Sequence, residues 1–207
     1  MLFLGLLVFI VAYLLGNLNG AVLVSRFLAK EDVRKKGSGN AGLTNYIRNY
    51  GAGSSVLVIA IDVLKAVIAC WLGGWILGIY GYHDDGVAVG ALGVILGHDF
   101  PALLDFKGGK GILSGVTVAL MLDWRLGLVV FGIFVVAYAI TQYVSLGSVL
   151  SAGSFGFLYA IFHWGSWFPI IVSFVLSFLI VWMHRANIER LLKGEERKTN
   201  LFKGKDK

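Results

Sequence analysis

The chain has 207 residues, of which 57% are hydrophobic and only 14% are charged, whereas a soluble domain of this size carries roughly 25% charged residues. This composition excludes an ordinary soluble domain and indicates an integral membrane protein. The net charge of +6 requires no nucleic-acid partner, because the basic residues flank apolar stretches, as they do on the cytoplasmic side of membrane spans.

The first 25 residues contain no charged side chain. Apolar runs of about 18 residues or more are typical of membrane spans, so we predict a first span over about Met1–Val24. A cleavable secretion signal would place positive charge before its apolar core, whereas here the basic residues, beginning at Arg26, follow it. The order predicts an outside N-terminus and a cytoplasmic flank after the span.

A polar loop to about Gly53 leads into Ser54–Leu104, which at about 1.5 Å per residue is long enough to cross a 30 Å hydrocarbon core twice. The glycines and aspartates near Tyr80–Gly86 predict the turn between these crossings. The single cysteine, Cys70, lies in this apolar region. No Cys/His spacing in the sequence is typical of a metal site, so we expect neither a metal nor another cofactor.

Two topologies fit the second half of the chain. The eleven residues of Ile112–Leu122 give roughly 17 Å of helix, which is short for a span. The 58 residues from Leu126 to Met183 lack Asp, Glu, Lys and Arg and suffice for two or three crossings. We predict an all-α membrane protein with seven spans. The alternative is five spans with a re-entrant segment at 112–122.

Positive charge orients this topology. Sixteen of the 18 Lys and Arg residues fall into three clusters: six between Arg26 and Arg48, two at Lys107 and Lys110, and eight from Arg185 onward. All three clusters belong on the cytoplasmic side. We therefore expect a cytoplasmic C-terminus and one membrane domain over residues 1–207, with its three polar segments facing one compartment.

The first polar segment is KKGSGNAGLTNYIRNYG, Lys35–Gly51. Its glycines permit turns that point several backbone N–H groups into one concavity, and the Arg48 fork adds bidentate recognition of phosphate or carboxylate. The alternative is a solvated membrane loop. Besides Arg48, the candidate ligands are Gly37, Ser38, Gly39, Asn40, Thr44 and Asn45.

The second segment is FKGGKG, Phe106–Gly111. It lacks the GxxxxGK[ST] spacing of a nucleotide-binding loop and a preceding strand. Bare amides at the glycines, followed by a helix start near Ile112, nevertheless favour a phosphate site. The alternative is a turn with snorkelling lysines. The candidate ligands are Lys107, Gly108, Gly109, Lys110 and Gly111.

The third segment, HRANIERLLKGEERK, begins at His184 and continues the last span as a helix that we expect to stop at Gly194. Helical spacing places His184 and Asn187 on one face. Together they fit a base with an orienting amide, whereas the alternative is an interfacial anchor.

Asp62 and Lys65 lie inside the second predicted span, three residues apart. Ionisable residues at that depth usually face a partner or a polar cavity. They form either a purely structural salt bridge or a brace beneath the cytoplasmic site.

Taken in order, GSGNAGLTNYIR (Gly37–Arg48), GHDFPALLDFKGGKG (Gly97–Gly111) and HRANIERLLKGEE (His184–Glu196) resemble the bacterial acyl-phosphate:glycerol-3-phosphate acyltransferase family. The resemblance implies a seven-span enzyme of the bacterial inner membrane with a cytoplasmic active site. It implies transfer of an acyl chain from acyl phosphate to glycerol-3-phosphate, the first step of phospholipid synthesis, without a cofactor.

The resemblance also assigns roles. It implies that Ser38 and Arg48 are essential, that the KGGKG glycines bind glycerol-3-phosphate, that His184 and Asn187 serve activity and that Glu195 is structural. We expect these residues to act in a monomer surrounded by membrane lipid.

The chemistry agrees with the residues, because an acyl phosphate is already activated and needs no covalent nucleophile. We hypothesise that KGGKG and Arg48 hold glycerol-3-phosphate, that Ser38 and Asn40 polarise the acyl phosphate and that His184 assists proton removal. In the alternative, a substrate phosphate takes the proton.

Three other functions compete with acyl transfer: a transporter of a phosphorylated solute, a lipid-binding scaffold and a phosphatidyl transferase. The sequence contains neither the internal repeats expected of such a transporter nor the clustered aspartates that a phosphatidyl transferase requires. A lipid-binding scaffold leaves the glycine-rich loops unexplained.

Overall fold

The structure is a computed structural model that describes residues 1–199. Within these residues it contains α-helices and two short 3-10 helices but no strand. The elements are α1 (Leu2–Gly16), α2 (Gly20–Leu28), η1 (Val33–Lys35), α3 (Leu43–Tyr50), α4 (Ser55–Gly78), α5 (His83–Asp99), η2 (Ala102–Leu104), α6 (Ile112–Leu122), α7 (Trp124–Thr141), α8 (Val144–Phe162), α9 (Trp167–Met183) and α10 (Arg185–Leu192).

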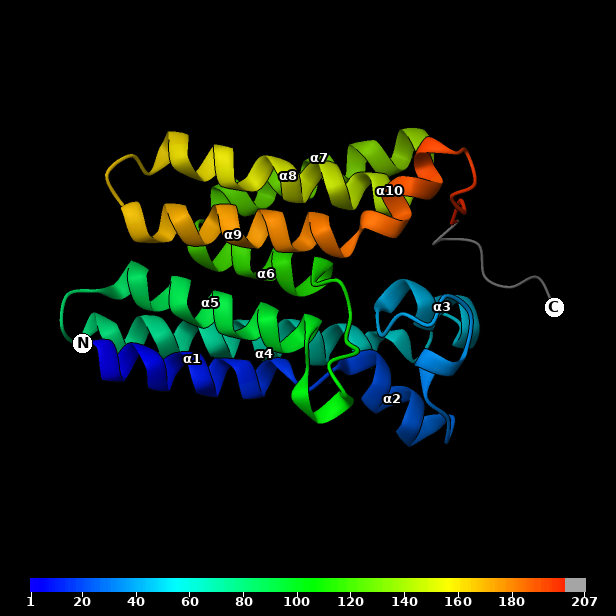
Figure 1. Cartoon of the computed structure of the whole chain (residues 1–207), viewed down its shortest axis with the longest axis horizontal. Coiled ribbons are helices and arrows are strands. Elements are labelled where there is room, and N and C mark those ends of the chain that lie inside the picture. The colour runs from blue at the N-terminus through cyan, green and yellow to red at the C-terminus, as the bar shows by residue number, and fades with distance from the viewer. Residues whose placement is uncertain (200–207) are drawn as a thin grey trace.

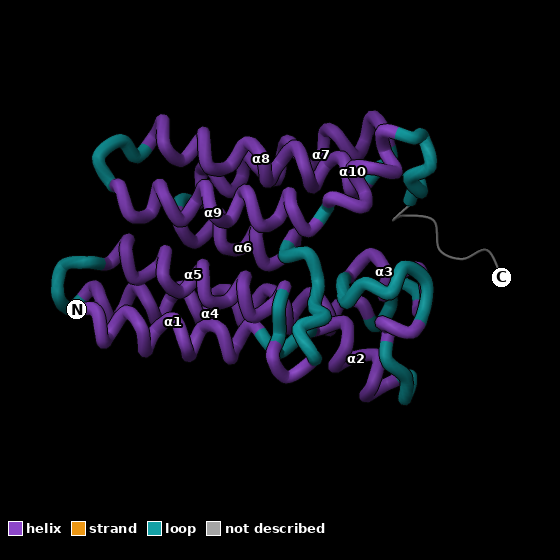
Figure 2. Tube along the Cα trace, in the orientation of Figure 1, coloured by secondary structure: helices purple, strands orange, loops and turns teal. Residues whose placement is uncertain are grey.

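The long helices lie side by side along one axis in two groups (Figure 1). Helices α1, α4 and α5 pack together, as do α7, α8 and α9, and α6 contacts helices of both groups. The short helices α2, α3 and α10 lie at one end of this bundle, together with the loop that precedes α6 (Figure 2). The fold therefore carries its polar segments at a single end.

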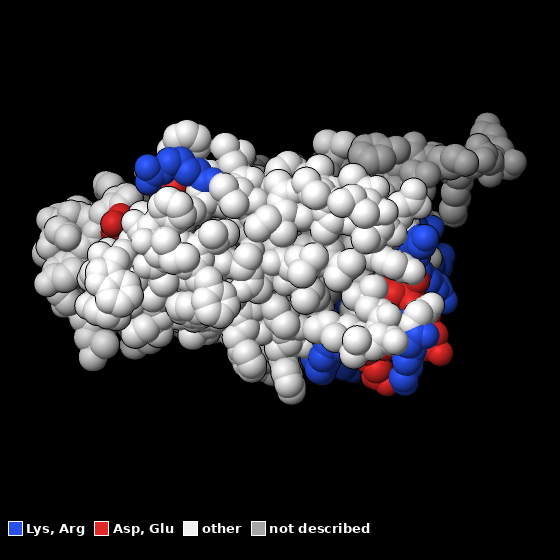
Figure 3. Space-filling view, turned by 90° about the horizontal axis from the view of Figure 1, so that it is seen from above, with Lys and Arg blue, Asp and Glu red and all other residues white. Residues whose placement is uncertain are grey.

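Surface charge follows the same division. In the space-filling view, charged side chains gather near the ends of the bundle, and most of them lie at the end that carries α2, α3 and α10 (Figure 3). A wide uncharged belt lies between. This is the surface expected of a protein whose middle is embedded in lipid, and the chain is a multi-pass membrane protein.

Five helical segments of the described chain are long and apolar enough to cross a membrane, namely Leu2–Leu28, Ser55–Gly78, His83–Leu104, Trp124–Thr141 and Val144–Phe162. Helices α9 and α10 add a sixth if the pair, bent by 57°, is counted as one span. The predicted double crossing between residues 54 and 104 is confirmed, and residues 126–183 form three helices. Because α6 is short, the count of seven spans stays a prediction, as does the outside N-terminus.

The first predicted span is broken. Helix α1 ends at Gly16 and α2 begins at Gly20, after Asn19, whose side-chain oxygen accepts the Val22 N–H at 3.0 Å. Asn19 also donates to the Ala41 carbonyl at 2.9 Å. At this break the buried Lys65 ammonium donates to the backbone carbonyls of Gly16 and Leu18.

Glycine lets the helices of the first group approach closely. A Cβ on Gly97 of α5 would lie 2.1 Å from the Tyr13 carbonyl oxygen of α1. A Cβ on Gly86 of α5 would lie equally close to the Gly73 carbonyl oxygen of α4. Many of the 28 glycines therefore serve helix contact, as small residues do in membrane proteins.

Candidate active site

The three polar segments meet at one end of the bundle. The Lys110 ammonium, from the loop before α6, donates a hydrogen bond to the Asn187 side-chain oxygen on α10. Arg48, on α3, donates to the hydroxyl of Thr199 and, at 3.4 Å, to the Arg197 carbonyl. The predicted co-location of these segments is therefore confirmed within residues 1–199.

The loop of the first motif is held together by Asn45. Its side-chain NH₂ donates to the carbonyls of Val33, Lys36 and Asn40 at 3.0–3.1 Å. Its oxygen accepts the Ser38 N–H at 3.0 Å. Because this buried amide spends its donors inside the loop, Asn45 shapes the loop, and we no longer assign it to a substrate.

Two glycines give this loop its turns. Gly37 and Gly39 have φ angles of +59° and +73°, a left-handed conformation that glycine adopts without steric cost. The turns leave Ser38 exposed at the tip, with Asn40 and Thr44 partly buried behind it. These three side chains, like that of Arg48, remain accessible polar groups of the motif.

The KGGKG loop packs tightly on the end of α5. A Cβ on Gly108 would lie 2.0 Å from the His98 carbonyl oxygen, and one on Gly109 would lie 2.1 Å from His98 Nε2. The Gly109 N–H donates to that same carbonyl at 3.1 Å. This amide is therefore not open to an anion, which corrects the expectation that each glycine of the loop offers a free N–H.

The lysines of the loop differ in environment. Lys107 is exposed, whereas Lys110 is partly buried and points toward α10. Burial, reinforced by the nearby charge of Arg190, lowers the pKa of Lys110 to about 8. Lys110 is therefore a cation near neutral pH that loses its proton in mildly alkaline solution.

A buried polar network lies directly beneath this loop. The Lys65 ammonium is 2.7 Å from Asp62 Oδ1 and 2.8 Å from His98 Nδ1, and all three side chains are buried. Lys65 also donates to the carbonyls of Gly16 and Leu18 at 3.3 and 3.0 Å, at the break between α1 and α2. The predicted Asp62–Lys65 salt bridge is therefore present.

His98 connects this network to the loop, because its backbone carbonyl and its imidazole both touch the KGGKG glycines. The sequence contained this signal in the GHDF stretch, but the stretch alone did not identify the contact. The neighbouring Asp99 is also buried, and its carboxylate has no hydrogen-bond partner among the described residues. Its Oδ1 would lie 3.1 Å from a Cβ on Gly111.

His184 lies at the bend between α9 and α10 and is buried. Its Nδ1 is 2.8 Å from the Ile180 carbonyl oxygen. Since a carbonyl only accepts, Nδ1 carries the hydrogen, and Nε2 of the neutral ring has a lone pair. The Ile180 carbonyl thus orients the imidazole, which corrects the expectation that the Asn187 side chain does so.

The side chain of Asn187 is instead bonded to Glu196. Glu196 Oε1 accepts from Asn187 at 2.7 Å and from the Ser145 hydroxyl at 2.9 Å, while Oε2 accepts from Arg190 at 2.7 Å. Burial opposes ionisation, yet these hydrogen bonds outweigh it and hold the pKa of Glu196 below its usual value. Glu196 is therefore the carboxylate around which α10 is ordered.

Glu195, which we expected to be structural, is exposed. The physical reason is the stop at Gly194, which is confirmed with φ +71°. The chain reverses there, and the Glu195 N–H bonds back to the Arg190 carbonyl at 2.8 Å. This reversal turns the following side chain, Glu196, toward α10 and leaves that of Glu195 outside.

The residues after Glu196 lie against Arg48. The Thr199 N–H donates to the Gln142 carbonyl at 3.0 Å, and the Thr199 carbonyl accepts from the Tyr138 hydroxyl at 2.7 Å. Thr199 is thus anchored to the end of α7 while its hydroxyl contacts the Arg48 guanidinium. In this structure the chain's own oxygens accept from one guanidinium nitrogen of Arg48, Nη2.

Comparisons with known proteins agree on one family. A family model described as glycerol-3-phosphate acyltransferase matches residues 6–194. The glycerol-3-phosphate acyltransferase of Thermoanaerobacter pseudethanolicus is 41% identical over 189 residues, covering 91% of this chain and 92% of the relative. That of Clostridioides difficile is 38% identical over 197 residues, covering 93% and 94%.

Solved structures are similar as well. The crystal structure of PlsY (YgiH), an integral membrane glycerol 3-phosphate acyltransferase, in its glycerol 3-phosphate form matches with a TM-score of 0.85 and 30% identity, covering 96% of this chain and 99% of that one. The lysophosphatidic acid form matches with a TM-score of 0.81 and 30% identity, covering 95% and 96%. With sequence, motifs and fold in agreement, the chain belongs to the glycerol-3-phosphate acyltransferase family.

Proposed function

We propose that α3, the KGGKG loop and α10 form the substrate pocket in which this acyltransferase moves an acyl chain from acyl phosphate to the sn-1 hydroxyl of glycerol-3-phosphate. The new ester bond joins the glycerol oxygen to the acyl carbon, and the bond from that carbon to the phosphate oxygen breaks. The products are 1-acyl-glycerol-3-phosphate and inorganic phosphate. The observation that carries the proposal is the convergence of Arg48, Lys110 and Asn187 from three distant segments.

Glycerol-3-phosphate binds at Arg48 and Lys110, with Lys107 at the edge. A guanidinium pairs with phosphate bidentately, and a partly buried ammonium adds charge where water screens it little. The N-terminus of α6, which follows Gly111, offers further backbone donors. On binding, the phosphate replaces the Thr199 hydroxyl and the Arg197 carbonyl at Arg48, and Asn187 contacts the glycerol hydroxyls.

The acyl phosphate lies at the first motif. Ser38, Asn40 and Thr44 supply hydroxyl and amide donors to its phosphate. The backbone N–H groups of Ser38 and Gly39 already bond within the loop, to Asn45 Oδ1 and the Lys36 carbonyl, so side chains rather than amides bind this phosphate. Catalysis then rests on alignment of two bound reactants, which is worth up to about 7–11 kcal/mol in favourable cases. The acyl tail extends between helices into the lipid.

The proton of the sn-1 hydroxyl of glycerol-3-phosphate passes to Nε2 of His184. Nε2 of the neutral imidazole is an acceptor because Nδ1 is committed to the Ile180 carbonyl. If a substrate phosphate takes the proton instead, His184 positions that substrate. A His184→Gln variant separates the two, since near-normal turnover contradicts the general-base role.

Asp62, Lys65 and His98 brace the site from below. Their hydrogen bonds join the break after α1, helix α4 and the end of α5, and His98 contacts the glycine loop. A buried ion pair contributes little stability by itself, so its value here is to fix where the loop lies.

The enzyme operates as a monomer in the bacterial inner membrane, with the pocket in the cytoplasm. The collection of basic residues at the pocket end supports this orientation, and one chain supplies every group named above. The test is to give purified protein palmitoyl phosphate and glycerol-3-phosphate. We expect release of phosphate and formation of lysophosphatidate without added metal. Equal activity with acyl-CoA, or no product with acyl phosphate, contradicts the donor assignment.

A further inference from the structure

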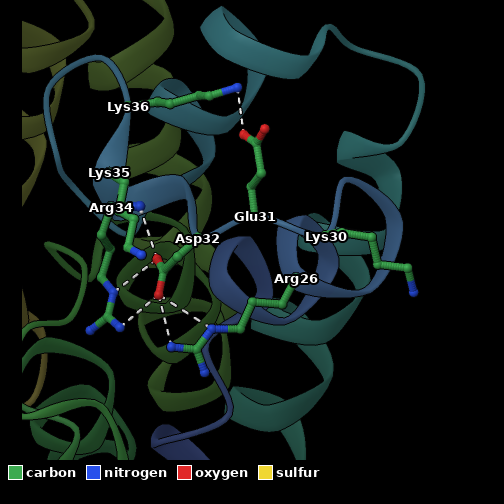
Figure 4. A pocket seen from close by; sticks show the side chains of 7 residues that line it. All are labelled: Arg26, Lys30, Glu31, Asp32, Arg34, Lys35 and Lys36. Carbon is green, nitrogen blue, oxygen red and sulfur yellow. Dashed lines mark hydrogen bonds and ion pairs between the residues drawn. The ribbon is translucent and has the colours of Figure 1, made fainter.

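A second basic site lies outside the candidate active site, where α2 ends and η1 begins. It is a recess of about 620 Å³, and Figure 4 shows its side chains. It shares no residue with the proposed substrate ligands. The lining residues are Arg26, Lys30, Glu31, Asp32, Arg34, Lys35 and Lys36.

The two acidic residues of the recess are already paired. Asp32 lies 2.8 Å from both Arg26 and Arg34, and the Arg34 guanidinium holds the pKa of Asp32 well below its usual range. Glu31 lies 2.5 Å from Lys36. Five basic and two acidic side chains leave the recess with a formal net charge of +3.

Lys30 and Lys35 carry the charge that remains available. Neither forms an ion pair with any residue in the described part of the chain. Arg34 is further committed, because it donates to the carbonyls of Leu104 and Lys107 at 2.8 and 3.2 Å. Figure 4 shows Lys30 and Lys35 at opposite sides of the recess, so each offers a separate free cation to an anion.

Lys30 occupies a backbone position that lysine rarely takes. Its φ is +56°, in the left-handed region just after α2, where helices usually place glycine. From this position the Lys30 ammonium forms a cation–π contact with Phe27, at 5.6 Å from the centre of the ring. The ammonium is thus held beside an exposed aromatic side chain.

The recess begins where a membrane span ends. The candidate span Leu2–Leu28 stops two residues before Lys30. On α2, the side chains of Leu23, Phe27 and Leu28 are exposed, with Phe27 at 74%. Apolar side chains beside the unpaired ammonium of Lys30 match a lipid, whose tails lie along the helix while its phosphate meets that ammonium.

We propose that this recess binds the phosphate headgroup of an anionic glycerophospholipid from the cytoplasmic leaflet. A soluble phosphate would gain nothing from Leu23, Phe27 and Leu28, so the apolar flank favours the lipid. The site is separate from the substrate pocket, and binding there does not depend on the function proposed for that pocket.

The test is lipid selectivity of the full chain. Protein is equilibrated in mixed micelles with equal amounts of phosphatidylglycerol and phosphatidylcholine of the same tails, and retained lipid is measured by native mass spectrometry. We expect the wild type to prefer phosphatidylglycerol. In the double variant Lys30→Gln/Lys35→Gln, the preference for phosphatidylglycerol over phosphatidylcholine should be about tenfold lower than in the wild type, because each surface lysine contributes to anionic-lipid binding. The charge-matched control Lys193→Gln/Lys198→Gln should retain it.

Equal phosphatidylglycerol preference in the wild type and the Lys30/Lys35 variant overturns the proposal, as does an equal loss in the control. Displacement of the lipid by excess inorganic phosphate overturns the choice of a lipid over a soluble anion. Lys30→Gly guards against misfolding, since glycine suits the left-handed position. It should lower the preference while thermal unfolding and acyl transfer stay at wild-type levels.

Discussion

The contact between Gly109 and His98 gives the sharpest prediction about the site. An alanine Cβ at position 109 would lie 2.1 Å from His98 Nε2 and 3.0 Å from the Ala41 carbonyl oxygen. Ordinary contact begins at 3.4 Å, so the loop or the imidazole must shift by more than about 1 Å. Overpacking of this kind costs about 1–3 kcal/mol. A loop shift of this size moves Lys110 away from bound glycerol-3-phosphate, and the loss of a hydrogen bond to a charged group costs about 1.5–3 kcal/mol of binding.

We therefore expect Gly109→Ala to fold but to lower kcat/KM for glycerol-3-phosphate by about 10- to 100-fold, chiefly through KM. The assay is phosphate release at saturating palmitoyl phosphate over a range of glycerol-3-phosphate. Gly132→Ala on α7 is the matched control, because a Cβ there meets nothing within 4 Å. A KM for Gly109→Ala within twofold of wild type, in a folded protein, would refute the reasoning.

Three further predictions concern charge. Because the pKa of Lys110 is about 8, its cation is present below that pH and lost as the pH rises through it, so KM for glycerol-3-phosphate should increase above about pH 8. Lys110→Arg should abolish that increase in a pH series of KM. Glu196→Gln should lower the thermal unfolding midpoint by the equivalent of about 1–3 kcal/mol, whereas Glu195→Gln should match wild type. Asp62→Asn or Lys65→Met alone should cost about 3–5 kcal/mol, measured by thermal unfolding, and the double variant Asp62→Leu/Lys65→Met should cost less than the sum. If the loss in the double variant equals the sum of the two single losses, Asp62 and Lys65 do not stabilise each other as a buried pair.

The sequence predicted the membrane class and the gathering of the polar segments, because both follow from one-dimensional patterns. Long uncharged runs define helices that lipid can surround, and clusters of lysine and arginine mark one side of a membrane. The same logic placed Arg48 and Lys110 at the same end. The number of spans stays a prediction because of α6, whose eleven residues are too few for length alone to decide.

The roles of individual polar residues were harder to predict. Asn45 has the composition of a ligand, and only the folded loop reveals that its amide is consumed by neighbouring backbone groups. Glu195 and Glu196 are adjacent and chemically identical, so their roles depend on the direction in which the chain turns at Gly194. His98 required knowledge of a contact between the end of α5 and a loop ten residues later.

The central claim is that α3 and the KGGKG loop contribute to one binding pocket. The direct measurement is the Kd of glycerol-3-phosphate, by calorimetry on purified protein, for Arg48→Gln and Lys110→Gln. Arg125→Gln, whose side chain pairs with Asp123 at 2.8 Å in the turn between α6 and α7, is the control. Each pocket variant should raise the Kd about tenfold or more, as expected for a lost charge-assisted hydrogen bond, and the control should not. Wild-type affinity in either pocket variant would contradict the claim.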